Sequence, residues 1–163
     1  MRTLAAGLLA AACLALAACG FRLRGTADVP FETVYVEGAN SGIALDLRRS
    51  IQAGTKARVI DDPKRAQAIL AFTQEGRDKQ ILSLTGTGAV REFRLRYVVG
   101  FRIHDGKGRD YVPNSVVTLT RDVSFNDTDV LAKETEEQLL FRDLQNDMVQ
   151  QIMRRLAAAK PAQ

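Results

Sequence analysis

The sequence predicts an α+β domain built as a two-layer sandwich, in which two helices cover one face of a mixed sheet of about four strands. Three observations predict it. One long segment alternates apolar and polar residues, two segments place apolar residues at helical spacing, and the elements follow the order β-α-β-β-β-α. The 163 residues, of which 46% are hydrophobic, suffice for one domain of ordinary size and not for two.

The first strand and the first helix lie near the start of the folded part. Residues 33–37 are β-branched or aromatic apart from the final glutamate, which is typical of a short strand. The following segment predicts an amphipathic helix that stops at Gly54. Its apolar residues recur at every fourth position and share one helix face: Ile43, Leu47 and Ile51.

The next part of the chain predicts three strands. The first begins with residues 66–72 and continues toward Leu84, with an irregularity near Gly76. Residues 91–104 give the clearest pattern, because successive apolar residues occupy one parity and mainly charged residues occupy the other. Residues 105–108, Asp-Gly-Lys-Gly, favour a tight turn into a returning strand.

The last predicted element is a long helix that starts after residues 126–129, which offer several N-cap side chains. Glutamates lie near its start and arginines near its end, as the helix dipole favours. Large apolar residues mark its buried face at every fourth position: Leu140, Leu144, Met148, Ile152 and Leu156. Because both helices are amphipathic, we expect them to cover the same face of the sheet.

The first residues of the chain indicate the cellular compartment. The apolar, uncharged run of residues 4–18 is shorter than the roughly 20 residues that a membrane-spanning helix needs, but it is typical of a signal peptide. It ends in Leu-Ala-Ala-Cys, residues 16–19, which resembles a bacterial lipobox. The predicted organisation is a signal peptide over residues 1–18, a lipidated Cys19 with an extended tether over 19–32, one domain over 33–157 and a short tail over 158–163.

Cys19 is the predicted attachment point of a covalent diacylglycerol and an N-acyl chain. Each buried methylene contributes roughly 0.8 kcal/mol, so two or more chains give stable anchoring. Gly20 resembles the residue that follows the modified cysteine in lipoproteins sent to the outer membrane, which predicts a location on its periplasmic face. Cys13 leaves with the signal peptide, so the mature chain is expected to have no free thiol and no disulfide.

Residues that usually carry catalysis or bind metals are scarce. His104 is the single histidine, and without a thiol or a second histidine zinc lacks a set of ligands. The Thr-Gly-Thr-Gly of residues 85–88 has neither the lysine nor the following helix of a phosphate-binding loop and is interpreted as a hairpin turn. The net charge of +4 is too small to favour a nucleic acid partner. The sequence therefore predicts no enzyme, no metal and no cofactor besides the acyl chains.

The arginines of residues 91–104 are the first candidate binding residues. Arg94 and Arg96 start about 7 Å apart on one face of the sheet, and Arg91 lies near the end of the strand. Guanidinium groups on an uncovered sheet face suit phosphate groups or an acidic protein wall. The alternative is a solvated face whose arginines keep the sheet soluble. Arg121 shares parity with apolar residues, so either a bulge turns it outward or it extends past them to a partner.

A resemblance to a known family begins at the predicted lipidation site. Residues 19–25, Cys-Gly-Phe-Arg-Leu-Arg-Gly, resemble the mature N-terminus of the lipopolysaccharide-assembly lipoprotein family LptE. The resemblance continues through Glu92-Phe93, the Leu-Ala-Lys of residues 131–133 and the Arg-Arg-Leu of residues 154–156. It covers nearly the whole mature chain, and the N-terminal heptapeptide is its most specific part.

The resemblance implies a fold of two helices on a four-stranded sheet and a function without covalent chemistry. Members of the family sit as a plug inside the β-barrel of LptD in the outer membrane. Together the two proteins form the translocon that delivers lipopolysaccharide to the cell surface. The lipoprotein helps the barrel to assemble and binds lipopolysaccharide itself.

The resemblance also implies which residues bind lipopolysaccharide. Lys133 and Arg121 stand where the family has basic residues, and Arg91 is a substitute for a basic residue that residues 85–88 lack. Together with the arginines on the strand face, the candidates for lipopolysaccharide binding are Lys133, Arg121, Arg91, Arg94 and Arg96.

Two interpretations from other functional classes stay open at this point. One is an envelope lipoprotein scaffold that contacts peptidoglycan. The other is a periplasmic hydrolase whose carboxylates meet only in the folded structure. A stable complex with a large β-barrel would favour the translocon role, whereas a monomer with turnover would favour the hydrolase.

Overall fold

The computed structural model describes residues 29–160, apart from residue 41 and residues 125–129. The predicted signal peptide and Cys19 lie outside this range. In chain order the elements are β1 (Thr33–Val36), α2 (Gly42–Gly54), β2 (Arg58–Val59), a short 3-10 helix (Pro63–Arg65), β3 (Ala68–Leu84), β4 (Val90–His104), β5 (Asp110–Ser124) and α3 (Val130–Ala158).

The sheet is mixed, with the strand order β2-β1-β3-β4-β5. β1 pairs in parallel with β2 and with β3, whereas β3, β4 and β5 are antiparallel neighbours. The α+β class is confirmed. The sheet has 5 strands where the sequence predicts about four, because β2 has only 2 residues and gives no periodic pattern of its own.

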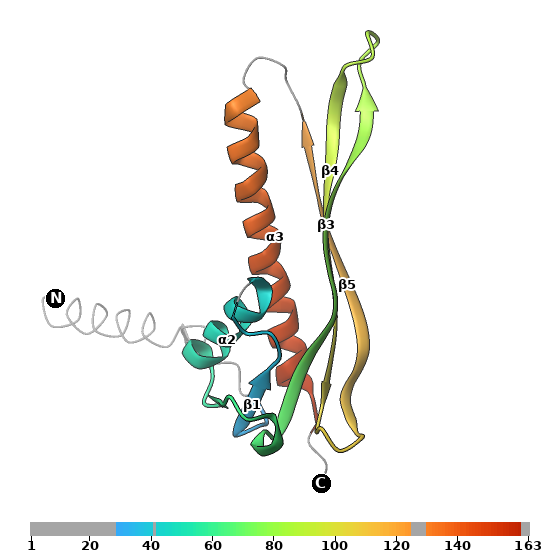
Figure 1. Ribbon diagram of the computed structural model, residues 1–163. Coiled ribbons are helices and arrows are strands. Elements are labelled where there is room, and N and C mark those ends of the chain that lie inside the picture. Colours follow the sequence, from blue (N-terminus) through green and yellow to red (C-terminus); the bar gives the residue numbers. More distant parts are fainter. Residues whose placement is uncertain (1–28, 41, 125–129, 161–163) are drawn as a thin grey trace, which may run out of the picture.

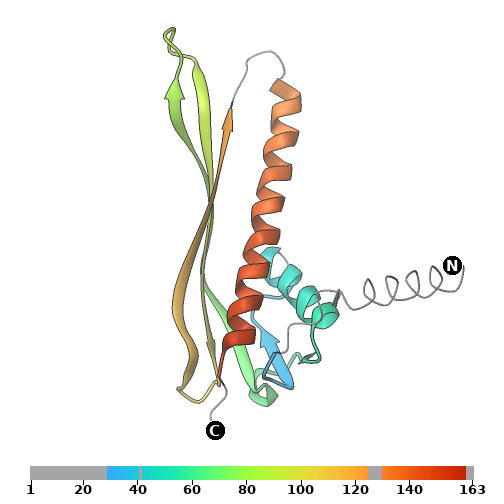
Figure 2. The ribbon, with the colours of Figure 1, turned by 180° about the vertical axis from the view of Figure 1, so that it is seen from behind.

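Both helices lie on the same side of the sheet, as Figure 1 and Figure 2 show from opposite directions. α2 packs at one end of the molecule, against β1, β2 and α3. β3, β4 and β5 continue past α2 as a long ribbon that α3 covers on one face, and the β3–β4 hairpin ends beyond the start of α3 (Figure 1). We call this ribbon, together with α3, the arm.

The core lies between the helices and the apolar parity of β4. Side chains from β4 alternate between this core and the opposite face, and α3 contributes one residue per turn, so both predicted periodicities are confirmed. The largest fully buried side chains of β4 and α3 are Leu95, Tyr97, Phe101, Ile103, Leu144, Met148, Ile152 and Leu156.

The packed part of the chain starts before β1. Val29 and Phe31 are 8% and 4% exposed, although the sequence assigns them to the tether. The Phe31 ring lies 5.0 Å from the Tyr111 ring of β5, so it covers the end of the core near the β4–β5 turn. Residues 29–32 therefore lie at the end of the domain opposite the β3–β4 hairpin (Figure 1).

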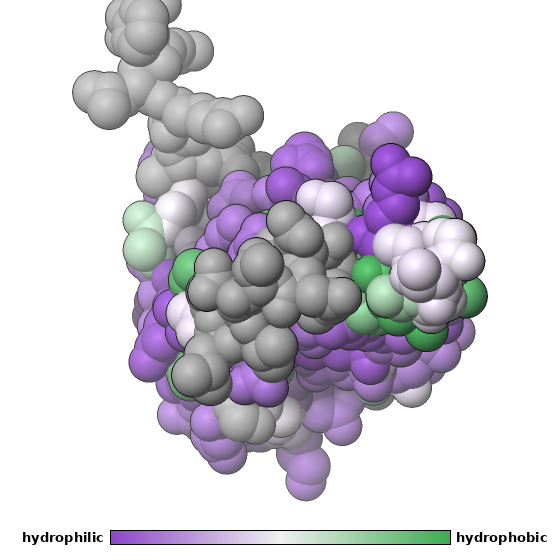
Figure 3. All heavy atoms as spheres, turned by 90° about the horizontal axis from the view of Figure 1, so that it is seen from above, coloured by the Kyte–Doolittle hydropathy of each residue, from purple (hydrophilic) through white to green (hydrophobic). Residues whose placement is uncertain are grey.

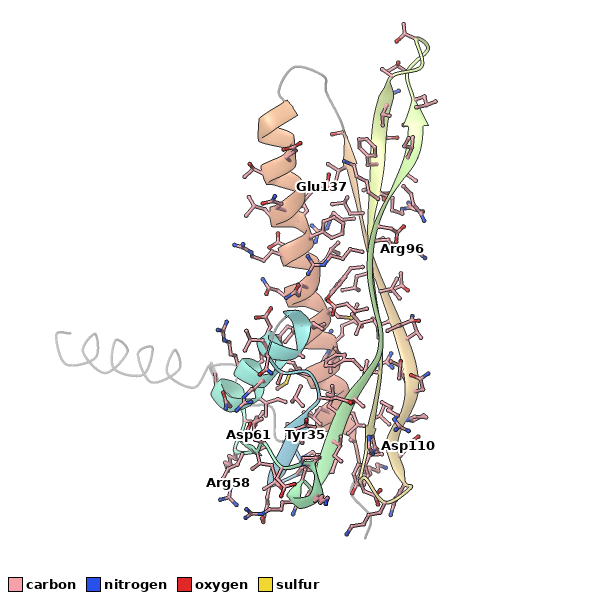
Figure 4. All side chains as sticks on the ribbon, in the orientation of Figure 1. Tyr35, Arg58, Asp61, Arg96, Asp110 and Glu137 are labelled. Carbon is pink, nitrogen blue, oxygen red and sulfur yellow. The ribbon has the colours of Figure 1, made fainter. Side chains whose placement is uncertain are left out.

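The part of β3 beyond β1 turns charged side chains toward α3. Arg77 donates a hydrogen bond to Gln145 of α3. Lys79 forms an ion pair with Glu137 of α3 at 2.5 Å and lies 4.1 Å from the centre of the Phe93 ring. Figure 4 shows Glu137 between the helix and the sheet. These contacts tie the open side of β3 to the helix.

β3 is one continuous strand whose register with β4 shifts at Thr73 and again between Ile81 and Leu84, but not at Gly76. The register with β4 shifts between Phe72 and Gln74. Gly100 faces this shift, since a Cβ atom there would lie 2.6 Å from the Thr73 Oγ1 atom. A Cβ atom on Gly76 would meet nothing within 4 Å. The glycine that the local geometry requires is therefore Gly100.

Candidate functional site

Two arginines of β4 project from the face of the sheet opposite α3, which we call the outer face. Arg94 stands across from Asp122 of β5 and donates two hydrogen bonds to its carboxylate, at 2.7 and 2.8 Å. Arg96 donates a hydrogen bond of 2.7 Å to Asp78 of β3, and Figure 4 places it on the side away from α3. Each guanidinium group therefore has a carboxylate partner, one on either side of β4.

These pairs determine the charge of the outer face. A row of unpaired guanidinium groups would attract phosphates. At the centre of the outer face, however, the charges of the two arginines are balanced by those of the two aspartates. All four side chains are more than one third exposed, so solvent screens the pairs and they contribute little to stability. The arginines occupy the predicted face, and their partners make it polar without a net positive charge.

The Arg94–Asp122 pair leads to a prediction about titration. The hydrogen bonds from Arg94 hold the pKa of the Asp122 carboxyl below its ordinary value. A carboxyl with a lowered pKa in the folded state stabilises the fold at pH values above its ordinary pKa, and this contribution is lost as the pH falls through the lowered value. We expect a carbon-13 NMR titration to find Asp122 below its ordinary pKa and Arg94→Gln to return it there. An Asp122 titration that is the same in both proteins would contradict the pairing.

Arg121 lies on the helix-facing side of the sheet. It stands across from Leu95, in a register that runs without a shift from Glu92 to Phe101 of β4. No bulge therefore turns it outward. Its guanidinium group extends past the apolar neighbours to Asp147 of α3, at 3.9 Å. Of the two alternatives that the sequence left open, the structure shows the extended side chain with a partner.

Arg91 and Lys133 belong to the hairpin end of the arm. Arg91 is exposed near the start of β4, directly after the β3–β4 turn. Lys133 lies in the first turn of α3, which begins at the same end of the arm (Figure 1), and its side chain is outside the described residues. The basic candidates thus do not form one patch, since Arg94 and Arg96 are paired on the outer face and Arg121 on the inner face.

The tip of the β3–β4 hairpin, residues 81–90, is apolar and exposed. Ile81, Leu82 and Leu84 are 59%, 41% and 56% exposed. No charged residue occurs from residue 81 to residue 90. Figure 3 looks down on this end and shows hydrophobic residues gathered at the hairpin beside a mostly hydrophilic surface. Exposed apolar residues grouped in this way make the tip a candidate interaction site.

These tip residues are not among the candidates predicted from the sequence. A signal was present, because an uncharged stretch stands out in a chain with 26% charged residues. Strand periodicity does not reveal it, since apolar residues in a strand are ordinarily expected to face the core. The exposure arises because the hairpin extends beyond α3, which no local pattern shows.

The tip is a hydrogen-bonded turn on a supported arm. The Thr85 backbone N–H donates to the Ala89 carbonyl at 2.7 Å, and the Gly88 N–H donates to the Thr85 carbonyl at 3.0 Å. Gly88 has a φ of 85°, which glycine adopts without steric cost. The Ser83 hydroxyl donates to the Glu92 carboxylate at 2.6 Å. The apolar side chains are therefore displayed by a defined hairpin.

A polar groove of about 450 Å³ lies where α2 meets the arm, lined by Asp46 of α2, Arg77 of β3 and residues of α3. The Gln145 side chain bridges it, donating to Asp46 of α2 and accepting from Arg77 of β3. Within the described ranges, no three His, Cys, Asp or Glu side chains gather as metal ligands. In the same part of the chain, no helix has the length and apolar character needed to cross a membrane. The polar groups of the groove are thus engaged with one another across the contact between α2, β3 and α3.

The sequence of the folded domain matches a known protein family. A family model described as LptE, lipopolysaccharide-assembly, matches residues 31–156, which include every strand and nearly all of α3. The chain belongs to the LptE family. The family predicted from the N-terminal heptapeptide and the later motifs is thereby confirmed.

Curated LptE relatives match nearly the whole chain. The LPS-assembly lipoprotein LptE of Yersinia enterocolitica is 29% identical over 160 residues, which are 96% of this chain and 76% of the relative. The LPS-assembly lipoprotein LptE of Photorhabdus laumondii is 26% identical over 161 residues, which are 96% of this chain and 86% of the relative. This LptE family member is therefore an envelope lipoprotein with a role in lipopolysaccharide assembly.

Solved structures share the LptE fold described above. The solution structure of lipoprotein B from Nitrosomonas europaea is 40% identical, with a TM-score of 0.74 over 85% of this chain and 91% of that chain. The crystal structure of the rare lipoprotein B from Shewanella oneidensis has a TM-score of 0.67 over 77% of this chain and 92% of that chain. At 20% identity, the second likeness shows the fold alone.

Proposed function

We propose that this LptE family lipoprotein acts with an LptD-type β-barrel of the outer membrane, as plug and assembly scaffold of the translocon that places lipopolysaccharide at the cell surface. It binds lipopolysaccharide without covalent chemistry and is held at the periplasmic face by acyl chains on Cys19. The relatives named as LPS-assembly lipoproteins support the pathway. The exposed apolar hairpin tip supports the binding.

The hairpin tip is the observation on which the binding proposal rests. Lipopolysaccharide is an amphiphile, with acyl chains next to anionic phosphates. Ile81, Leu82 and Leu84 present apolar surface to acyl chains, and each Å² removed from water contributes about 25 cal/mol. The exposed guanidinium group of Arg91 follows directly and suits a phosphate. Lys133, in the first turn of α3, is the second proposed cation.

The remaining basic candidates are proposed to contact lipopolysaccharide only after the hairpin tip has bound it. Arg94, Arg96 and Arg121 each have a carboxylate partner within the chain. A lipid phosphate would have to replace that partner before it could bind. We therefore propose the hairpin tip, Arg91 and Lys133 as the first contact, and the paired arginines as later ones.

The outer face supports the role as a plug. Its arginines are balanced by aspartates, so the surface is polar and carries little net charge at its centre. The interior of a wide outer-membrane barrel is polar and water-filled. A long arm with such a face fits a barrel lumen better than it fits a lipid phase.

Acidic substitutions in the hairpin tip are expected to weaken lipopolysaccharide binding at least tenfold, or about 1.4 kcal/mol. Ile81→Asp together with Leu84→Asp removes the apolar surface and adds charges that repel lipid phosphates. Binding is measured by calorimetry with the purified full-length protein and lipopolysaccharide in detergent. Leu139→Asp is the matched control, because Leu139 is 53% exposed but lies on α3. Equal binding by the hairpin variant and the control would remove the tip from the site.

The partner is tested by copurification of the tagged full-length protein from detergent-solubilised outer membranes. We expect a stable one-to-one complex with a large β-barrel protein. Cross-linking from photoreactive residues at positions 94, 121 and 133 would then identify the surfaces that meet it. A chain that elutes alone and shows hydrolytic turnover would instead favour the hydrolase interpretation.

A further inference from the structure

Four exposed basic residues lie at the end of the domain opposite the hairpin tip. Arg58 belongs to β2, and Lys64 and Arg65 belong to the 3-10 helix that follows it. Lys56 lies just before β2, and all four side chains are exposed. Figure 4 labels Arg58 at this end of the molecule, away from the hairpin. We call these four residues the basic end.

The basic end borders residues 29–32, the part of the predicted tether that the structure describes. The Arg58 backbone N–H donates a hydrogen bond to the Glu32 carbonyl at 2.8 Å. The Thr33 hydroxyl donates to the Arg65 carbonyl at 3.4 Å. Lys56 and Arg58 also line a hollow of about 380 Å³ together with residues 29–32. The cations are therefore held beside the segment that precedes β1.

The carboxylates at this end leave most of these cations without a partner. Among the described residues, none of the four side chains forms an ion pair. Asp61 is paired with Arg48 at 3.0 Å, and Asp62 accepts a hydrogen bond from the Lys64 backbone N–H at 3.0 Å. Glu32 is exposed and is the further carboxylate beside them. The basic end thus differs from the outer face, where each arginine has its own aspartate.

The predicted tether keeps the basic end close to the membrane. Val29 follows Cys19 by ten residues, so even a fully extended chain separates them by at most about 36 Å. Exposed charges attract one another over only about 8 Å at physiological ionic strength. A tether raises the local concentration of headgroups, which makes weak ionic contacts effective. An acyl chain combined with a basic patch therefore binds a membrane more stably than either does alone.

We propose that the basic end binds the phosphates of anionic phospholipids in the leaflet that holds the acyl chains of Cys19. The proposal rests on the acylation included in the proposed function, and it adds the class of lipid that this end contacts. Guanidinium groups bind phosphates through paired hydrogen bonds, and lysine binds them as a point charge. Headgroup phosphates are always within reach of a tethered domain, whereas an acidic protein surface is not. The tether therefore favours the lipid as the occupant.

One copy of the chain suffices for this contact, so it is compatible with a one-to-one complex with a barrel. With the basic end at the headgroups, the arm extends away from them, and the hairpin tip lies at the far end (Figure 1). The two ends of the domain then contact different lipids. The basic end contacts phospholipid headgroups, and the tip is left for lipopolysaccharide.

Fluorescence quenching in vesicles tests the contact. A dye is attached to Pro63→Cys in the full-length acylated protein, because Pro63 is exposed beside Lys64 and the mature chain is expected to have no free thiol. The vesicles contain phosphatidylethanolamine with either phosphatidylglycerol or phosphatidylcholine, and a trace lipid carries a nitroxide on its headgroup. Quenching is expected to be roughly twofold greater with phosphatidylglycerol. A dye on Gln138→Cys, exposed on α3, is expected to show no such difference.

Charge reversal then tests the cations themselves. Lys56→Glu with Arg58→Glu, made in the Pro63→Cys chain, is expected to lower the quenching with phosphatidylglycerol to the level with phosphatidylcholine. Arg142→Glu with Arg154→Glu is the matched control and changes the net charge by the same amount. Both of these arginines are exposed on α3 and have no ion pair within the described ranges. The control is expected to keep the quenching.

The two proposals can fail independently of each other. Lys56→Glu with Arg58→Glu is expected to bind lipopolysaccharide as the wild type does in calorimetry, whereas Ile81→Asp with Leu84→Asp is expected to keep the quenching. Mass spectrometry of the same preparations verifies the acyl groups on Cys19. Equal quenching of the Pro63→Cys dye in both kinds of vesicle would overturn the proposal and leave the basic end for an acidic protein surface. An equal loss of quenching in both charge-reversal variants would also overturn it.

Discussion

Phe101→Ala is expected to lower the free energy of unfolding by about 3–5 kcal/mol. Phe101 is 0% exposed and belongs to β4, which has a neighbouring strand on both sides. The Arg155 guanidinium group of α3 lies 5.7 Å from the centre of its ring. Truncation would leave a cavity between sheet and helix that a rigid strand cannot close. Urea denaturation followed by circular dichroism measures the change.

The control for this variant is Val116→Ala. Val116 lies on the neighbouring β5 and is 53% exposed, so its truncation is expected to change the free energy of unfolding by less than about 0.5 kcal/mol. If Phe101→Ala cost no more than Val116→Ala, the packing of α3 on β4 would be wrong, and with it the two-layer architecture.

Cys19→Ser is expected to leave the chain without acyl groups and to shift part of the protein out of the membrane fraction, while the share bound to the barrel partner stays there. Without the thiol no acyl chain is attached, and each chain contributes roughly 0.8 kcal/mol for every buried methylene. Fractionation of cells and mass spectrometry of the N-terminal peptide measure the effect.

Cys13→Ser is the matched control for the anchor. Cys13 lies within the predicted signal peptide, so its replacement is expected to leave the mature protein acylated and in the membrane fraction. If the N-terminal peptide of Cys19→Ser carried the same acyl groups as that of Cys13→Ser, the predicted attachment point would be wrong.

The strands that alternate regularly could be predicted from the sequence. In β4, every second residue from Phe93 to Ile103 is apolar, and the structure turns this parity toward α3. The same holds for the face of α3 that carries Leu144 and Ile152. In both elements the residues of the buried face recur at a fixed interval along the chain, and this recurrence produces the apolar periodicity in the sequence.

Other parts of the fold depend on contacts between distant residues and could not be predicted. β2 exists because Arg58 and Val59 find a parallel partner in β1, not because they form a strand alone. The first register shift of β3 lies at Thr73, where the chain passes Gly100, and not at the glycine of β3 itself.

The candidate site, too, could be predicted only in part. The sequence correctly placed Arg94 and Arg96 on one exposed face, because parity determines that. It could not show that Asp122 and Asp78 stand across from them. These partners belong to β5 and β3, and the register of those strands does not follow from the sequence of β4. The exposure of the hairpin tip also depends on where α3 begins relative to β3 and β4.

Depletion of the protein in the bacterium that produces it tests the central claim most directly. The measurement is the amount of newly made lipopolysaccharide that a surface-specific label can reach. If this chain serves lipopolysaccharide assembly, surface labelling should fall as the protein disappears, while lipopolysaccharide accumulates inside the surface, and wild-type protein should restore it. Undiminished surface labelling in cells that have lost the protein would contradict the account.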